Sequence, residues 1–394
     1  MENLPIVHVV NGRQKKLLQG HPWVYGNEIE RVEGEIEDGG LVTVVDFRGR
    51  YMGTGFYNSK SLITVRLLTH RQEEITDELI ASRVKAACDY RRFVMNRPGT
   101  DSCRLIYGEA DRLPGVIADR FGGGIVLQVL ALGMERFTQT IADALLACEK
   151  PDCLLLQNDD AIRRKEGMEC FTRVLYGTLP EENIIHENGV KLAVDVLGGQ
   201  KTGYFLDQKD NHLFVRQFCK DARVLDCFSY IGAFALNAAA AGAKEVTAVD
   251  ISETAVQLIE KNAALNGADI TAVCANCFDF LRAQVKAGEK YDVVVLDPPA
   301  FTKAHANMAS ACRGYKEIAL SAMRLLPAGG VLATHSCSYH MPEEVFVNTV
   351  LSAAQDLHRQ VRVITLRRQD IDHPVLAGYP ESHYLKSLWL QMLD

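Results

Sequence analysis

The stretch RVLDCFSYIGAFAL, from Arg223 to Leu236, predicts a buried strand, a turn and the start of a helix. The apolar strand ends in Asp226, and the turn carries Gly232. Because the pattern G-x-G-x-x-G is absent, a loop that binds the pyrophosphate of a dinucleotide is disfavoured, although the strand–turn–helix geometry remains. The stretch therefore predicts the first unit of an α/β sheet.

The same alternation continues on both sides of this stretch. Strands are predicted at 223–227, 245–250, 270–274, 291–296, 329–335, 361–367 and 384–392. Helices are predicted at 209–219, 232–241, 252–266, 276–286, 308–325 and 342–356. Strands that alternate with helices of this length predict a mostly parallel, doubly wound sheet, the Rossmann-like form of the α/β class.

The residues before position 189 follow other patterns. Short β-branched segments from Leu41 to Leu68, separated by turns, predict a small β-barrel. A helix from Thr76 to about Met95, a strand-rich block from Cys103 to Leu130, a helix at 136–148 and strands at 153–157 and 174–176 predict an α+β region. We therefore expect three domains, at 1–70, 71–188 and 189–394.

The overall composition is that of a soluble globular protein, with 47% hydrophobic and 24% charged residues among 394. No apolar stretch approaches the roughly 20 residues of a membrane helix, and the N-terminus lacks the apolar core of a signal peptide. The eleven scattered cysteines indicate reduced thiols in a cytoplasm. A net charge of -7 does not suggest non-specific coating of nucleic acid, but it leaves room for a local basic groove.

Acidic residues recur where the predicted strands end. Asp250 ends the second strand, where a carboxylate can accept hydrogen bonds from two ribose hydroxyls, and Asp279 follows the third, where one can receive an adenine amino group. The fourth strand ends in Asp297-Pro298-Pro299. Any one of these acids could simply cap a helix. Together and in order, they resemble the sheet of methyltransferases that use S-adenosylmethionine (AdoMet).

The segment GGQKTGYFLDQKDNH, from Gly198 to His212, lies before the first strand. Phe205 could cover one face of adenine, while Asp207 and Gln208 could close on the methionine end, although Asp207 alone could equally be a helix N-cap. The residues predicted to form the AdoMet site are Gln200, Phe205, Asp207, Gln208, Asp226, Phe228, Gly232, Asp250, Ile251, Ser252, Asp279, Phe280 and Asp297.

Two features bear on the group that is methylated. The D-P-P loop resembles the loop with which methyltransferases of exocyclic amines grip a planar amino group, and Phe301 could stack on a base. Cys337 follows the fifth strand within HSCS. A thiolate that attacks carbon 6 of a pyrimidine activates carbon 5 for methylation, and Asp297 could stabilise the charge that develops near ring nitrogen 3. Because neighbouring strand ends meet at one crevice, we expect Asp297 and Cys337 to face the same base.

Other cysteines and histidines carry less weight. Cys274 and Cys277 have C-x-x-C spacing, but no second pair follows, so no metal site is predicted. Cys227 is expected to be packing. His335 and His340 flank the S-C-S turn and could influence the pKa of the Cys337 thiol, although His340 is better explained as a solvent-facing residue.

Several longer motifs resemble one family. DCFSYIGAFAL, LDPPAF, THSCS and DHPVLAGYPESHYLKSLWL together resemble the ribosomal RNA large-subunit methyltransferase I family, which makes 5-methylcytidine in 23S rRNA. GHPWVYGNEI and the strands after it resemble the PUA domain of that family. The resemblance extends over nearly the whole chain. It implies AdoMet as cofactor and 23S rRNA as partner. A cytoplasmic enzyme without membrane association is expected from the cysteines and from the lack of a long apolar stretch, and a homodimer is compatible with the sequence, although nothing in it requires one.

Carried over by position, the resemblance makes Cys337 the nucleophile and Asp297 the residue that grips the base. Substrate contacts are expected from Pro298, Pro299, Phe301 and Lys303. Many RNA cytosine-C5 methyltransferases have a second cysteine after the proline of the fourth-strand loop, whereas this chain has Ala300. The group that removes the carbon-5 proton is therefore unassigned, with Lys303, Tyr315 and water as candidates.

The PUA-like region is expected to bind RNA, with contacts from Arg13, Lys15, Lys16 and Trp23. Two other functions fit the same residues. One is an RNA methyltransferase that acts on an exocyclic amine or a ring nitrogen and in which Cys337 is structural. The other is an RNA-binding protein without catalytic activity that retains AdoMet.

Overall fold

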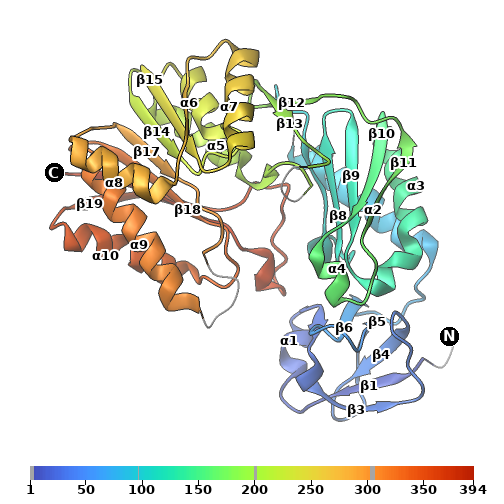
Figure 1. Ribbon diagram of the computed structural model, residues 1–394. Helices are drawn as coiled ribbons and strands as arrows, with labels where there is room; N and C mark the ends of the chain where they lie inside the picture. The colour runs from blue at the N-terminus through green and yellow to red at the C-terminus, as the bar shows by residue number, and fades with distance from the viewer. Residues whose placement is uncertain (1–3, 96, 199–201, 302–306) are drawn as a thin grey trace.

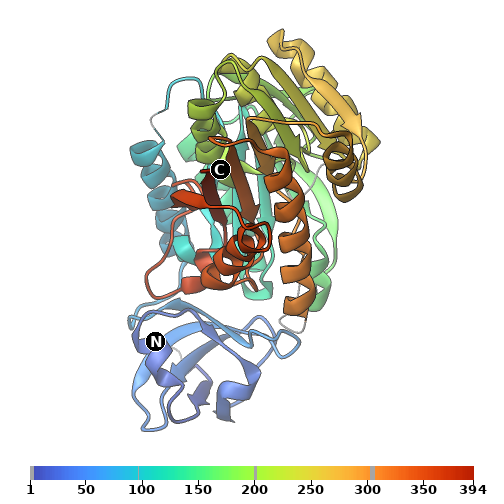
Figure 2. The same ribbon diagram turned by 90° about the vertical axis from the view of Figure 1, so that its left-hand side faces the viewer.

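The computed structural model describes residues 4–95, 97–198, 202–301 and 307–394, and three sheets follow one another along the chain (Figure 1). The N-terminal sheet (blue) packs beneath the middle sheet (cyan to green), and the C-terminal sheet with its helices (yellow to red) lies beside the middle one. Figure 2 shows the molecule after a quarter turn about the vertical axis, with the N-terminal sheet again below the other two. No helix in the described ranges has the length and apolar character that a membrane span requires.

The first sheet has six strands in the order β2-β6-β5-β4-β1-β3. Its strands are β1 (Ile6–Val9), β2 (Trp23–Val24), β3 (Ile29–Glu33), β4 (Leu41–Val45), β5 (Tyr51–Tyr57) and β6 (Val65–Thr69), and α1 (Gln14–Leu18) lies between β1 and β2. Gly55 on β5 allows close approach to β6, since a Cβ atom there would lie 2.2 Å from the carbonyl oxygen of Arg66. The predicted small β domain is confirmed as a curled sheet around an apolar core.

The middle sheet has five strands in the order β11-β10-β9-β8-β7. They are β7 (Cys103–Tyr107), β8 (Val116–Phe121), β9 (Gly124–Val129), β10 (Cys153–Asn158) and β11 (Phe171–Gly177), accompanied by α2 (Asp77–Val94), α3 (Thr138–Glu149) and α4 (Ala161–Lys165). Apolar side chains of α2 and α3, such as Ile80 and Ile141, share one core with the sheet. The predicted α+β region is confirmed, and only β9 and β10 run parallel.

A hairpin of β12 (Asn183–Glu187) and β13 (Val190–Val194) connects the middle sheet to the C-terminal one. Its Leu192 belongs to a core shared with Phe121 of β8 and with Leu236 in the C-terminal part. The predicted boundary between residues 188 and 189 falls in the turn of this hairpin. The division of the chain into three domains at residues 70 and 188 stays a prediction.

The C-terminal sheet has seven strands in the order β16-β15-β14-β17-β18-β20-β19. Its strands are β14 (Arg223–Cys227), β15 (Glu245–Asp250), β16 (Thr271–Cys274), β17 (Val293–Leu296), β18 (Val331–Ser336), β19 (Val361–Arg367) and β20 (Lys386–Met392). Only β20 is antiparallel to its neighbours, between β18 and β19. The predicted α/β class with a mostly parallel sheet is confirmed.

Helices cover both faces of this sheet. They are α5 (Lys209–Val215), α6 (Ala233–Ala240), α7 (Glu253–Asn266), α8 (Cys277–Ala287), α9 (Met308–Leu325) and α10 (Glu343–Asp356). Val224 of β14 packs in a core with residues of α5, α6 and α7, whereas the next residue, Leu225, packs in a core with residues of α8, α9 and α10. This alternation buries both faces of the strands, as a doubly wound sheet requires.

The segment that leads into β20 holds the C-terminal sheet against the other two. His21 of the first sheet lies 3.2 Å from Glu381, and the rings of Trp23 and Tyr379 are 4.8 Å apart. Arg91 of α2 donates to the carbonyl oxygen of Asp372 at 2.9 Å. All three sheets therefore meet at the segment that immediately precedes β20.

Candidate active site

A cavity of about 860 Å³ lies where the parallel strands β14, β15, β17 and β18 end. Loops after these strands and the segment before β14 form its wall. The predicted site residues that line it are Phe205, Asp207, Gln208, Phe228, Asp250, Ile251, Asp297, Pro298, Pro299, Phe301 and Cys337. The carboxyl ends of parallel strands are the usual place for ligands in such sheets.

Five predicted site residues lie outside the wall of this cavity. They are Asp226, Gly232, Ser252, Asp279 and Phe280. Gln200 and Lys303 fall outside the described residues, so their positions are not given. The strand ends thus bring most of the predicted residues together in one cavity wall.

Asp226 supports the loop after β14 from behind. Its Oδ2 accepts from Ser229 Oγ at 2.5 Å and from the backbone N–H of Ala235 at 3.1 Å, and burial raises its pKa to about 7. The loop is strained, because Phe228 and Tyr230 have φ of 63° and 51° although neither is glycine. Asp226 therefore fixes a strained loop whose side chains form the cavity wall.

Asp250 also holds the loop that follows β14. Its Oδ2 accepts from the N–H of Tyr230 at 2.9 Å, and its Oδ1 accepts from the N–H of Ser252 at 3.0 Å. Ser252 is the N-cap of α7, since its side chain accepts from the N–H of Ala255. The carboxylate of Asp250 is thus held in place at the cavity wall, and Ser252 is engaged with the helix.

Asp279 does not face the cavity, contrary to its predicted place in the AdoMet site. It lies on the exposed side of α8, where Arg282 is 2.5 Å away, and Phe280 packs partly buried against the core on the α9 side. Because α8 begins at Cys277, the strand end itself presents Asn276, which lines the cavity and caps the helix by accepting from the N–H of Phe278. The sequence signal for Asn276 was its N-cap position, two residues after the end of β16.

Asp297 lies at the opposite end of the cavity from β15, at the end of β17. The side chain of Gln208 donates to Oδ2 of Asp297 at 2.9 Å. The backbone N–H of Asp297 donates to the carbonyl oxygen of Cys227 at 3.3 Å. Burial, followed by the neighbouring charge of Asp207, raises the pKa of Asp297 to about 7. Near neutral pH this carboxyl group therefore exists in both its protonated and its charged form.

Cys337 follows β18, which pairs directly with β17, and its side chain lines the cavity together with Asp297. The preceding residue, Ser336, shares a 2.9 Å hydrogen bond with the hydroxyl of Tyr315 on α9. His335 is fully buried between the rings of Phe234 and Trp389, and burial lowers its pKa to about 3. His335 is therefore neutral, and the predicted influence of its charge on the thiol is not present.

Sequence reasoning missed a buried polar group behind the cavity. The hydroxyl of Tyr204 donates to Glu187 Oε2 at 2.9 Å, and His212 Nδ1 lies 2.6 Å from Glu187 Oε1. Tyr204 and His212 line the cavity, whereas Glu187 comes from hairpin β12–β13. No sequence pattern links these three residues, because they come together only when the hairpin packs on α5 and α6.

Aromatic side chains make up a second wall near Asp297. Phe301 lies 4.7 Å from the ring of Tyr315, 5.8 Å from that of Phe278 and 6.5 Å from that of Phe228. Flat apolar surfaces of this kind can take a heterocyclic base by stacking. The cavity thus combines carboxylates, aromatic faces and the thiols of Cys277 and Cys337.

Known proteins resemble this chain in both sequence and structure. A family described as S-adenosylmethionine-dependent methyltransferase matches residues 125–369, and one described as PUA-like domain matches residues 7–70. The ribosomal RNA large subunit methyltransferase I of Klebsiella pneumoniae (strain 342) is 42% identical over 388 residues, 97% of each chain. The protein of the same name from Salmonella arizonae is 41% identical over 390 residues, 98% of this chain and 96% of that one.

A solved structure shares the fold at lower identity. It is a putative SAM-dependent methyltransferase from Streptococcus mutans, with a TM-score of 0.84 and 20% identity, and the match covers 98% of this chain and 99% of that one. A second structure with the same TM-score is a putative methyltransferase complexed with SAH. The arrangement of three sheets is therefore shared with proteins of distant sequence.

Proposed function

The chain belongs to the ribosomal RNA large subunit methyltransferase I family and is an AdoMet-dependent methyltransferase, and from this premise we propose that it methylates carbon 5 of a cytosine in the RNA of the large ribosomal subunit. The observation that carries the proposal is the pairing of Cys337 with Asp297 in one cavity wall, at the ends of adjacent strands. A thiol and a carboxyl group with a pKa of about 7 suit covalent catalysis on a pyrimidine.

The cavity residues fit AdoMet. Asp250, already held by two backbone N–H groups, has the carboxylate that ribose hydroxyls need, and Phe228 and Phe278 offer apolar faces for adenine. Asp207 and Gln208 lie toward Asp297, where they would hold the amino-acid end. When bound, AdoMet supplies an electrophilic methyl group. We propose Asp226 as the support of this site, and we assign to Asn276 the adenine-recognition role that was expected of Asp279.

The reaction begins when Cys337 has lost its proton to solvent. Its Sγ bonds to carbon 6 of the cytosine, and the electrons of the carbon 5–carbon 6 double bond move into the ring toward nitrogen 3. Protonated Asp297 donates a hydrogen bond there and stabilises that charge. Carbon 5 then takes the methyl group. Loss of the carbon-5 proton and cleavage of the sulfur–carbon 6 bond restore the aromatic ring and release the thiolate.

The acceptor of the carbon-5 proton is water in this proposal. Tyr315 is a poor candidate, because burial raises the pKa of its hydroxyl and that hydroxyl shares a hydrogen bond with Ser336. Tyr315 also does not contribute to the cavity wall. Ala300, which does line the cavity, has no group that could take a proton.

The N-terminal sheet is proposed to bind the RNA. Two of its predicted contacts are engaged within the protein, because Lys16 Nζ lies 2.6 Å from Glu28 and Trp23 donates to Glu109 at 2.7 Å. Arg13 and Lys15 are exposed. We therefore assign phosphate contacts to Arg13 and Lys15 rather than to Lys16 or Trp23.

The test uses Cys337→Ala and, as a matched control, Cys312→Ala, which removes a half-buried thiol on α9. Both proteins are incubated with large-subunit RNA and labelled AdoMet, and the methylated nucleoside is identified by mass spectrometry. We expect 5-methylcytidine from the wild type and the control, and a loss of at least about 10³-fold in Cys337→Ala. Full activity in Cys337→Ala would exclude the covalent mechanism.

The same experiment separates the other functions. A methyl group on adenine or guanine would exclude the cytosine reaction, and AdoMet binding without any transfer would favour a binding protein. RNA that contains 5-fluorocytidine gives a direct readout, because fluorine at carbon 5 blocks the last step. We expect it to leave RNA covalently attached to wild-type Cys337 under denaturing conditions, and to leave none on Cys337→Ala.

A further inference from the structure

Lys386 is the first residue of β20 and lies beside the turn that carries Cys337. In the antiparallel pairing of β18 with β20, Lys386 is opposite Ser336. Its Nζ donates to the carbonyl oxygen of Ser338 at 2.6 Å. The ammonium group therefore contacts the backbone directly after Cys337, and its neighbour Leu385 lines the same cavity as the thiol.

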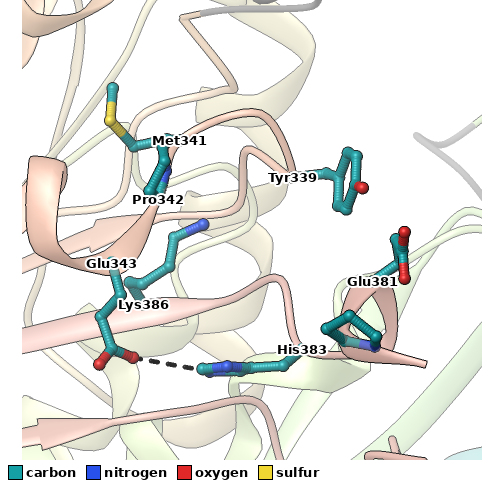
Figure 3. A pocket seen from close by; sticks show the side chains of 8 residues that line it. Tyr339, Met341, Pro342, Glu343, Glu381, His383 and Lys386 are labelled. Carbon is teal, nitrogen blue, oxygen red and sulfur yellow. Dashed lines mark ion pairs between the residues drawn. The ribbon is translucent and has the colours of Figure 1, made fainter. Parts of the chain in front are cut away.

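The charge of Lys386 is buried without a direct ion pair to a carboxylate among the described residues. The residue is 3% exposed, and no carboxylate in the described part of the chain forms an ion pair with it. The carboxylate of Glu343 lies beside His383, at 3.9 Å, and the ammonium end of Lys386 points away from it (Figure 3). A buried cation of this kind is costly unless an anion forms next to it.

We propose that Lys386 is the counter-ion of the Cys337 thiolate, an inference that rests on the proposed function of that thiol. When Sγ loses its proton to solvent, the negative charge forms beside the ammonium group, which keeps its own proton throughout. The same ammonium stabilises the thiolate again when the sulfur–carbon 6 bond breaks. Lys386 is thus a positioning residue, because it acts on the substrate only through Cys337.

The groups that face the turn from the neighbouring strands do not supply this positive charge. His335 on β18 is neutral, because burial lowers its pKa to about 3. Asp297 at the end of β17 carries no charge or a negative one. Burial lowers the pKa of Lys386 to about 8, and the negative charges of Cys337 and, to a smaller extent, Glu343 act in the opposite direction.

The helices and loops around the turn lead to the same conclusion. Tyr315 on α9 is neutral, because burial raises the pKa of its hydroxyl. Glu343 at the start of α10 is a carboxylic side chain and supplies no positive charge, and burial lowers the pKa of the adjacent His383. Burial also raises the pKa of Tyr339, whose neighbour Glu381 lies 3.2 Å from His21. Among these groups Lys386 is the one that carries a positive charge near pH 7.

The test measures how fast iodoacetamide alkylates Cys337 at a series of pH values, in the full chain without RNA, with peptide-resolved mass spectrometry. Three variants separate charge from hydrogen bonding: Lys386→Gln keeps a donor for Ser338, Lys386→Arg keeps the charge, and Lys386→Met keeps neither. We expect the alkylation midpoint to rise by about one pH unit in the Gln and Met variants, and the rate at pH 7 to fall about tenfold. Lys386→Arg should stay close to the wild type.

Lys316→Gln, on α9 with its ion pair to Asp356, is the matched control for loss of a distant charge and should leave the midpoint unchanged. A wild-type midpoint in Lys386→Gln would overturn the proposal, since the lysine would then only hold the Ser338 carbonyl. If the Gln and Met variants do not fold, the wild type still decides. Its Cys337 midpoint must lie below the value of about 8.5 of a free thiol, and a midpoint at or above that value overturns the ion pair.

The outcomes are independent of those that test the proposed function. Alkylation requires neither RNA nor methyl transfer, so a low midpoint at Cys337 together with an active Cys337→Ala protein would sink the covalent mechanism and leave the ion pair. An inactive Cys337→Ala protein, together with an unchanged midpoint in Lys386→Gln, would support the covalent mechanism and overturn the ion pair. Melting temperature and AdoMet affinity, measured for each variant, show that the fold is retained.

Discussion

The two ends of the cavity use strand-end side chains in different ways. At the cofactor end, after β14 and β15, Asp226 and Asp250 are held by N–H and O–H groups that lie at most twenty positions away in the sequence. At the reaction end, after β17 and β18, Asp297 receives its hydrogen bond from Gln208 and Cys337 lies beside Lys386, 89 and 49 positions away in the sequence respectively. Local contacts therefore fix geometry at one end, and long-range contacts set reactivity at the other.

Replacement of Asp297 by Asn should have the largest effect among the variants that test this difference. The Asn side chain cannot supply an acidic proton at ring nitrogen 3, so we expect single-turnover methyl transfer to fall about 10²- to 10⁴-fold. AdoMet affinity should change by less than ~3-fold, because Asp250 stays in place. Stopped reactions with labelled AdoMet and calorimetric titration measure the two quantities. A loss explained by AdoMet affinity alone would place Asp297 at the cofactor end.

Replacement of Asp250 by Ala should give the opposite pattern. Hydrogen bonds to a charged carboxylate contribute about 1.5–3 kcal/mol each, so we expect AdoMet affinity to fall about 10- to 100-fold. The rate at saturating AdoMet should remain within a few-fold of the wild type. Calorimetric titration and rates at several AdoMet concentrations provide the check. If the saturated rate collapsed as well, the two ends would not be separable.

The contrast also explains what the sequence could predict. The positions of Asp250 and Asp297 follow from where β15 and β17 end, and hydrophobic periodicity alone locates those ends. Asp279 was misplaced because a shift of three residues at a strand–helix junction turns a side chain from the cavity to solvent. No sequence pattern pointed to Lys386, because its place beside Cys337 depends on the antiparallel insertion of β20 between β18 and β19.

Asn276 and Asp279 offer a sharper test of that junction. Asn276→Ser keeps a side chain able to cap α8 but shortens its reach into the cavity, so we expect AdoMet affinity to fall about 5- to 10-fold, as for one lost hydrogen bond. Asp279→Ala removes a carboxylate that pairs with Arg282 on the surface and should change affinity by less than ~2-fold. Equilibrium titration of both variants decides between them, and the reverse order would restore Asp279 to the adenine site.

The smallest expected effect concerns the pH dependence of the reaction end. The pKa of Asp297, raised by burial to about 7, keeps the carboxyl group protonated below pH 7, and that form is lost as the pH rises through 7. Because the Cys337 thiolate increases over the same range, single-turnover rates should pass through a maximum. The Gln208 hydrogen bond lowers the pKa of Asp297, so Gln208→Ala should move the alkaline limb upward by less than about one pH unit.

Gln139→Ala, at an exposed site on α3, is the control and should leave the profile in place. The direction of the shift is the informative quantity. A limb that moved downward in Gln208→Ala would mean that Gln208 stabilises the protonated carboxyl group. A limb that did not move would mean that the falling rate comes from a group other than Asp297. An upward shift in Gln208→Ala would connect a residue placed before β14 to the reactivity of a carboxyl group at the end of β17. Gln208 would then act at the reaction end in addition to its proposed contact with the amino-acid end of AdoMet.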